Sequence, residues 1–281
     1  MKQNLLCHGA WLVLFLLPGI LAPAQVTILP TSVFLTDQWG LGSVDISNNT
    51  GQKQEVSIDF QFAWLGNDED GGLMMINQED EIADRYSVDE QIRAFPRSFL
   101  LPPGGSQTVR VQVRPLREKP DGVYWTRAVI TSSPAASDID HVSLSENIGT
   151  RIQYVFKQNI PVFYKKGEVN TGLQILEVKT EMKTDRIVVY VRLRPTGNAP
   201  YNGRVQTALR NSSGQVILNR QTTAVIYFES LRRLELPLSE VPLDQGIYAL
   251  ELLYETKRND IPASELVQAV PVTYTVLIKI G

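Results

Sequence analysis

The sequence VSIDFQF (Val56–Phe62) decides the fold class of this chain. Apolar and polar side chains alternate along it, so an extended backbone presents one apolar face and one polar face, as in a half-buried β-strand. The sequences VDIS (Val44–Ser47), VRVQV (Val109–Val113) and VYWTRAV (Val123–Val129) follow the same period of two. Turn-forming sequences rich in Gly, Pro and Asn separate these stretches. The pattern predicts short strands joined by turns.

The rest of the chain follows the same plan. We expect strands at residues 173–178, 187–193, 205–209, 231–238, 248–254 and 270–278. The sequence NSSG (Asn211–Gly214) predicts a hairpin turn, and only residues 77–92 favour a helix, which would be short and lie on a loop. Regular short strands without intervening helices are typical of antiparallel sandwiches. We therefore expect an all-β protein with two immunoglobulin-like β-sandwich domains, residues 25–166 and 167–281.

Composition excludes several classes of function. The chain has 281 residues, of which 43% are apolar, enough for a folded core. Its 27 basic and 30 acidic residues give a charge of −3, so we expect no nucleic-acid partner. The single cysteine, Cys7, excludes disulfide frameworks and Cys-rich zinc sites. We find no phosphate-binding loop and no nucleophile elbow, and we interpret the acidic sequence Asn67–Gly72 as a hairpin turn rather than a calcium loop. We expect neither an enzyme nor a metal site.

The N-terminus has the features of an export signal. Lys2 precedes the apolar run AWLVLFLL (Ala10–Leu17), and APA (Ala22–Ala24) places small residues where a signal peptidase cleaves. The alternative is a membrane anchor, but the run is short for a span. We expect residues 1–24 to be a signal peptide, and the mature chain to have no membrane span and to be periplasmic, with the cell surface as the alternative.

Several segments occur in the order found in one known family. The first sandwich contains ILPTSVF (Ile28–Phe34), DISNNT (Asp45–Thr50), FPRSFLLPPGGSQTVRV (Phe95–Val111) and RIQYVFKQNIPVFYKK (Arg151–Lys166). The second contains NAPY (Asn198–Tyr201). In this order and spacing they resemble the PapD-like periplasmic chaperones of pilus assembly. The resemblance covers residues 25–166 well and the remainder loosely.

The resemblance implies a mechanism. Members of the family cap a pilus subunit that lacks its last strand by lending it their own G strand, and they pass the subunit to an outer-membrane usher. Such a chaperone needs no cofactor. The main chain of the donated strand completes the subunit's sheet, while alternate side chains fill its groove. In this sequence the donor positions are Ile152, Tyr154, Phe156 and Ile160. Alternation alone is equally compatible with side chains that face the domain's own core.

Two positions depart from the family's pattern. The family binds the subunit's C-terminal carboxylate through an arginine on the first strand and a lysine near the end of the G strand. Here Ser32 and Pro161 occupy those positions, and neither carries a charge. The candidate substitutes are Arg93, Arg97, Arg151 and Lys157. The alternative function is therefore a structural or adhesive envelope protein. Free edge strands would also permit a homodimer.

Overall fold

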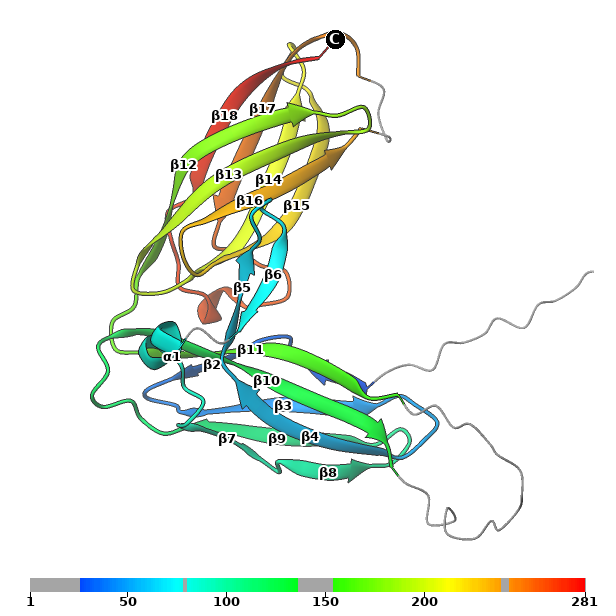
Figure 1. Cartoon of the computed structure of the whole chain (residues 1–281), viewed down its shortest axis with the longest axis vertical. Helices are drawn as coiled ribbons and strands as arrows, with labels where there is room; N and C mark the ends of the chain where they lie inside the picture. Colours follow the sequence, from blue (N-terminus) through cyan, green and yellow to red (C-terminus); the bar gives the residue numbers. More distant parts are fainter. Residues whose placement is uncertain (1–25, 78–79, 136–153, 239–242, 281) are drawn as a thin grey trace, which may run out of the picture.

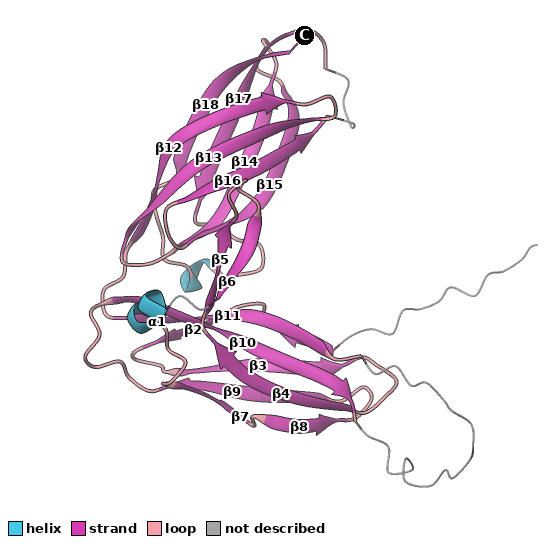
Figure 2. Cartoon of the chain, viewed as in Figure 1, coloured by secondary structure: helices cyan, strands magenta, loops and turns pink. Residues whose placement is uncertain are grey.

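The protein consists of two β-sandwiches that meet at an angle (Figure 1). The structure is a computed structural model that describes residues 26–77, 80–135, 154–238 and 243–280. Figure 2 shows that these residues form mostly strands joined by loops, with very little helix, which confirms the predicted all-β class with two immunoglobulin-like sandwiches. The predicted signal peptide, residues 1–24, lies outside the described residues.

The first sandwich is built from two sheets. One has the order β1-β3-β9-β7, and the other has the order β2-β11-β10-β4-β8. All pairings are antiparallel except that of β2 with β11, which is parallel. The strands are β1 (Val26–Leu29), β2 (Val33–Thr36), β3 (Leu41–Asn48), β4 (Gln54–Gln61), β7 (Ile92–Phe95), β8 (Ser98–Leu101), β9 (Ser106–Val113), β10 (Gly122–Pro134) and β11 (Phe156–Lys166).

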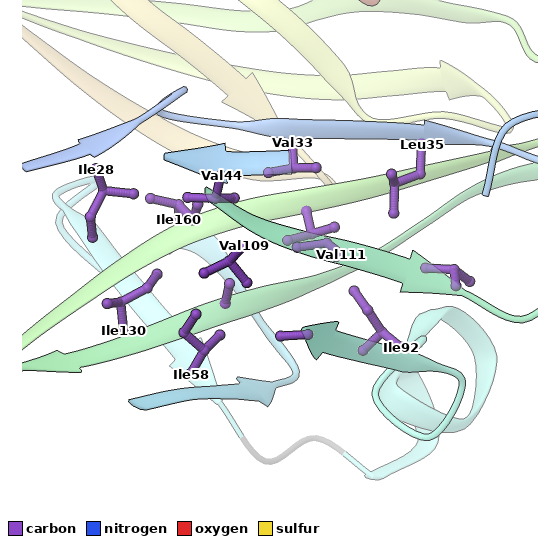
Figure 3. Packing of buried hydrophobic residues seen from close by; sticks show 14 of the residues in the cluster. Ile28, Val33, Leu35, Val44, Ile58, Ile92, Val109, Val111, Ile130 and Ile160 are labelled. Carbon is purple, nitrogen blue, oxygen red and sulfur yellow. The ribbon is translucent and has the colours of Figure 1, made fainter. Parts of the chain in front are cut away.

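The first core lies between these sheets. Strand β9 shows why the alternation was informative: Val109, Val111 and Val113 are buried, and the polar residues between them are exposed. Figure 3 shows Val109 and Val111 in this core together with Ile58 of β4 and Ile130 of β10. The buried valine and isoleucine side chains stabilise the fold mainly through the hydrophobic effect.

The second sandwich has a separate core. Its sheets have the orders β12-β13-β16 and β15-β14-β17-β18, with antiparallel pairing throughout. Its elements are β12 (Thr171–Met182), β13 (Arg186–Gly197), β14 (Tyr201–Arg210), β15 (Val216–Ile226), β16 (Ser230–Pro237), β17 (Gly246–Glu255), the short 3-10 helix η1 (Ala263–Glu265) and β18 (Val272–Ile280). Strands β15 and β16 are edge strands of the two facing sheets, so this side of the sandwich is open.

A hairpin from the first sandwich reaches the second. Strands β5 (Ala63–Asn67) and β6 (Leu73–Asn77) pair only with each other, and Figure 1 shows them rising beside β15 and β16. At the hairpin tip the Gly71 carbonyl oxygen accepts a 2.8 Å hydrogen bond from the Arg233 N–H. The short helix α1 (Asp80–Tyr86) follows this hairpin and is the helix expected within residues 77–92.

Aromatic side chains fill the junction between the sandwiches. Trp125 of β10 is buried there, with its ring centroid 4.7 Å from that of Tyr86 and 4.9 Å from that of Tyr227. Trp64 of β5 meets Phe228 of the second sandwich edge-on at 5.6 Å. This junction cluster joins the two cores. Its ring pairs add to the stability gained from their buried area.

Asn198 connects the two sandwiches through polar contacts. Its side-chain oxygen accepts a hydrogen bond from the Asn170 N–H at 2.9 Å. Its side-chain nitrogen donates to the carbonyl oxygens of Asp121 at 3.1 Å and Glu168 at 2.9 Å. The Asn198 carbonyl oxygen accepts from the Val123 N–H. One residue of the NAPY sequence thus binds β10 of the first sandwich and the linker that follows β11.

Candidate functional site

One edge of strand β11 is open along half of its length. The other edge pairs with β10 from Phe156 to Lys166. Strand β2 covers the outer edge only from Val162 to Lys165. No strand of the described chain pairs with the outer edge of residues 156–161. An unpaired strand edge offers backbone N–H and C=O groups to a further strand.

Large apolar side chains lie at the start of this open segment. Tyr154 is 63% exposed and Phe156 is 37% exposed. Their rings stack with centroids 6.4 Å apart and an interplanar angle of 24°. The neighbouring Val155 is exposed as well. Exposed apolar groups beside an open strand edge are typical of an interaction surface.

The predicted donor residues differ in their exposure to solvent. Tyr154 and Phe156 are exposed, whereas Ile160 is 7% exposed and belongs to the first core, where Figure 3 shows it. Ile160 is therefore not available to fill a groove in another protein. Ile152 lies outside the described residues.

The two predicted anchor positions, Ser32 and Pro161, lie in different surroundings. Ser32 is half-buried and lines a small cavity of about 220 Å³ with residues of the second sandwich such as Pro262. Pro161 lies on β11 directly opposite Arg127 of β10. Residues opposed in an antiparallel pair point to the same face of the sheet. Arg127 and Pro161 thus share a face with Trp125 and Phe163, the face that turns toward the second sandwich.

Arg127 is a buried cation that the sequence analysis did not single out. It is 9% exposed, and its Nε has no hydrogen-bond partner within the described chain. The positive charge of Arg127 acts on Tyr227 of the second sandwich. Burial raises the pKa of Tyr227 to about 12, and the Arg127 charge opposes part of that increase. A buried guanidinium without a carboxylate partner favours binding of an anion.

The predicted substitutes for the anchor are less suitable. Arg97 pairs with Asp59, and the Arg93 guanidinium donates to the backbone oxygens of Asp89 and Ile92. Lys157 is exposed, and Arg151 lies outside the described residues. Arg127, by contrast, is buried and lies directly opposite Pro161.

The acidic sequence at Asn67–Gly72 forms the turn of the β5–β6 hairpin. An Asp68 carboxylate oxygen accepts hydrogen bonds from the Asp70 N–H at 3.0 Å and the Gly72 N–H at 2.7 Å. Within the described ranges no three His, Cys, Asp or Glu side chains gather as a metal site. None of the described helices is long and apolar enough to cross a bilayer.

Comparison with known proteins gives no sequence match but several structural ones. A scan against protein-family models finds no match, and a search of the curated proteins finds none either. Among solved structures, this chain is similar to the CupB2 chaperone of Pseudomonas aeruginosa, with 11% identity, a TM-score of 0.44, and 91% of this chain and 100% of that chain covered.

Two further solved structures are similar to this chain over nearly its whole length. The E. coli chaperone DraB has 13% identity and a TM-score of 0.42, with 90% of this chain and 97% of that chain covered. A chain of the CsuC–CsuE chaperone–tip adhesion subunit pre-assembly complex from Acinetobacter baumannii Csu pili has 12% identity and a TM-score of 0.43, with 91% and 98% covered. The chain is thus similar, at low identity, to solved members of the PapD-like chaperone family that its sequence resembles.

Proposed function

We propose that this protein is a periplasmic chaperone that binds and caps a pilus or envelope subunit through the open edge of β11. The observation that carries the proposal is the coincidence of an unpaired edge at residues 156–161 with the exposed rings of Tyr154 and Phe156. The edge supplies main-chain hydrogen bonds, and the rings supply apolar groups for alternate pockets. Together they meet the requirements of strand addition to another sheet.

The segment available for donation has a defined end. Pro161 has no N–H group, so strand addition along the outer edge loses a donor at this residue. The next residue, Val162, already pairs with β2. The donated segment is therefore residues 152–160, with Tyr154 and Phe156 as its described client-facing side chains and Ile152 continuing the alternation.

We assign the anchoring role to Arg127. A client strand on the outer edge of β11 would end near Pro161, and the Arg127 side chain shares the face of that residue. A C-terminal carboxylate placed there would give the buried guanidinium the charged partner that it lacks within the described chain. The proposed mechanism consumes no nucleotide and needs no cofactor, because the free energy comes from filling the client's open sheet.

The test is co-purification from periplasm, with a C-terminal tag on the wild type and on the double variant Tyr154→Asp/Phe156→Asp. An unpaired carboxylate in an apolar groove costs several kcal/mol, so the variant should bind its client at least about a hundredfold more weakly. Tyr274→Asp is the matched control, because Tyr274 is an exposed aromatic residue on β18 of the second sandwich. A second variant, Arg127→Gln, should weaken binding while leaving the strand edge intact.

If the proposal is correct, the wild type and the control variant recover a β-rich subunit that lacks a strand. The Tyr154→Asp/Phe156→Asp variant should lose this partner, and Arg127→Gln should recover less of it. If the same partner binds the double variant and the wild type equally, the β11 edge is not the working surface. If folded wild type recovers no such subunit, the alternative holds, and the two sandwiches serve as a structural module.

A further inference from the structure

The second sandwich breaks its apolar pattern at one place on three strands. On β14 the inward positions Val205 and Leu209 are in the core, but Thr207 lies between them. The residues of β15 that pair with Val205 and Thr207 are Thr222 and Arg220, so both point inward as well. Thr207 is buried, whereas Thr222 and Arg220 are exposed on the edge strand, so polar side chains replace apolar ones from the core to the rim of this face. Such a departure from the apolar pattern is expected at functional sites.

The third strand contributes a buried arginine. On β16 the residues Leu234 and Leu236 are in the core, and Arg232 continues the same face. Arg232 is 6% exposed, and its Nη2 donates to the Thr223 carbonyl oxygen at 3.0 Å. Its Nη1 has no partner in the part of the chain that the structure describes. Burial lowers the pKa of Arg232, and the nearby Tyr254 opposes only part of that decrease.

These side chains line one cavity of about 410 Å³ on the open side between β15 and β16. Residues Gly72 and Leu73 of the β5–β6 hairpin close its end. One carboxylate lines it, that of Glu235, and this group already pairs with Arg186 at 2.9 Å and with Arg233 at 3.3 Å. The acidic residues 68–70 of the hairpin turn do not line the cavity.

The residues that line the cavity therefore carry more positive than negative charge. Arg220 makes no hydrogen bond or ion pair with any described residue, and Arg232 has no carboxylate partner among them. The hydroxyls of Thr207 and Thr222 lie beside these cations and can donate to the same ligand.

We propose that this cavity is a binding site for a tetrahedral oxyanion, a phosphate or sulfate group. Arg220 and Arg232 reach it from the edge strands of two different sheets, and Thr207 and Thr222 reach it from the sheet that contains β15. Donors that converge from several directions fit a tetrahedral anion better than a planar carboxylate, which one guanidinium can bind through two parallel bonds. The site is separate from the β11 edge and does not depend on the proposed chaperone function.

The test is isothermal titration of the full chain with inorganic phosphate, sulfate and acetate at an ionic strength held constant with sodium chloride. We expect saturable binding of phosphate and sulfate at one site, and weaker binding of acetate. A titration with glucose 1-phosphate distinguishes a site for free phosphate from one that accepts a phosphate group on a larger molecule.

The decisive variant is Arg220→Gln, because Arg220 is exposed and unpaired within the described residues and its replacement leaves the core intact. It should weaken phosphate binding about tenfold, the effect of one lost charge-assisted hydrogen bond. Arg114→Gln removes an exposed arginine of the first sandwich and should bind phosphate like the wild type. Absence of saturable binding to the wild type would overturn the proposal, as would equal affinities of wild type and Arg220→Gln.

Discussion

Replacing Asn198 with alanine tests whether a single side chain holds the two sandwiches in their observed arrangement. The variant removes one acceptor, for the Asn170 N–H, and two donors, to the carbonyl oxygens of Asp121 and Glu168. It leaves the backbone bond from Val123 in place. The groups that lose their partners lie in the turn before β10 and on the linker after β11, so the damage is confined to the junction.

The expected loss follows from these three bonds. An intramolecular hydrogen bond contributes about 0.5–1.5 kcal/mol net, and the lower half of that range applies because the junction is partly open to water. We therefore expect Asn198→Ala to lower the free energy of unfolding by about 2 kcal/mol. Asn198→Asp should lower it at least as much, because a carboxylate would face the two carbonyl oxygens without a proton to donate.

The assay is urea unfolding followed by tryptophan fluorescence, since Trp64 and Trp125 both lie in the junction cluster. Asn49→Ala is the control, because the Asn49 side chain makes a single exposed hydrogen bond, to Thr27. If Asn198→Ala unfolds at the same urea concentration as Asn49→Ala, the side chain does not stabilise the junction and this reasoning is wrong.

Two further predictions concern the same junction. Gly71 has a φ of +76°, and a Cβ there would lie 2.8 Å from the Arg233 backbone nitrogen. Gly71→Ala should therefore detach the hairpin tip and speed amide hydrogen exchange at Arg233. Unchanged exchange at Arg233 would contradict the role of this contact. The Glu168 N–H and then Lys166 lower the pKa of Asp121 in the folded chain below its ordinary value. The stabilising effect of the carboxylate is therefore present at neutral pH and is lost as the pH falls through the folded pKa. Unfolding midpoints measured from pH 6 to 3 should therefore fall less for Asp121→Asn than for the wild type, and equal slopes would refute this.

Strand content was predictable because it depends on local alternation. Residues 56–61 and 109–113 are parts of β4 and β9, with the expected faces buried or exposed, whereas Phe62 lies beyond the end of β4 in the junction cluster. Strand β15 was not among the predicted strands, because its middle, residues 219–223, is polar on both faces. Thr222 and Arg220 of β15 line the cavity that we interpret as an anion site. The polar sequence that prevented the prediction of this strand is thus explained by the cavity.

The candidate site was predictable only in part. Alternation could not decide whether Tyr154, Phe156 and Ile160 face solvent or core, because that depends on where the facing sheet ends. Tyr154 and Phe156 proved exposed, whereas Ile160 proved buried. Arg127 was missed because alternation predicts one solvent-facing side for residues 123–129, whereas β10 is buried on both faces from residue 122 to residue 128. Its position opposite Pro161 depends on the register of two strands far apart in the sequence.

The junction cluster has a consequence for the order of folding during synthesis. Trp64 and Trp125 are buried partly by Tyr227 and Phe228, which belong to the C-terminal half of the chain. Residues 167–281 number 115, and a ribosome adding about 5–20 residues per second needs roughly 6 to 23 seconds to make them. If the first sandwich folds as soon as it is complete, its tryptophan face stays uncovered for that time. The nascent chain is prone to aggregation during that interval, and replacing Tyr227 or Phe228 with a small residue would leave part of the face uncovered in the finished chain as well.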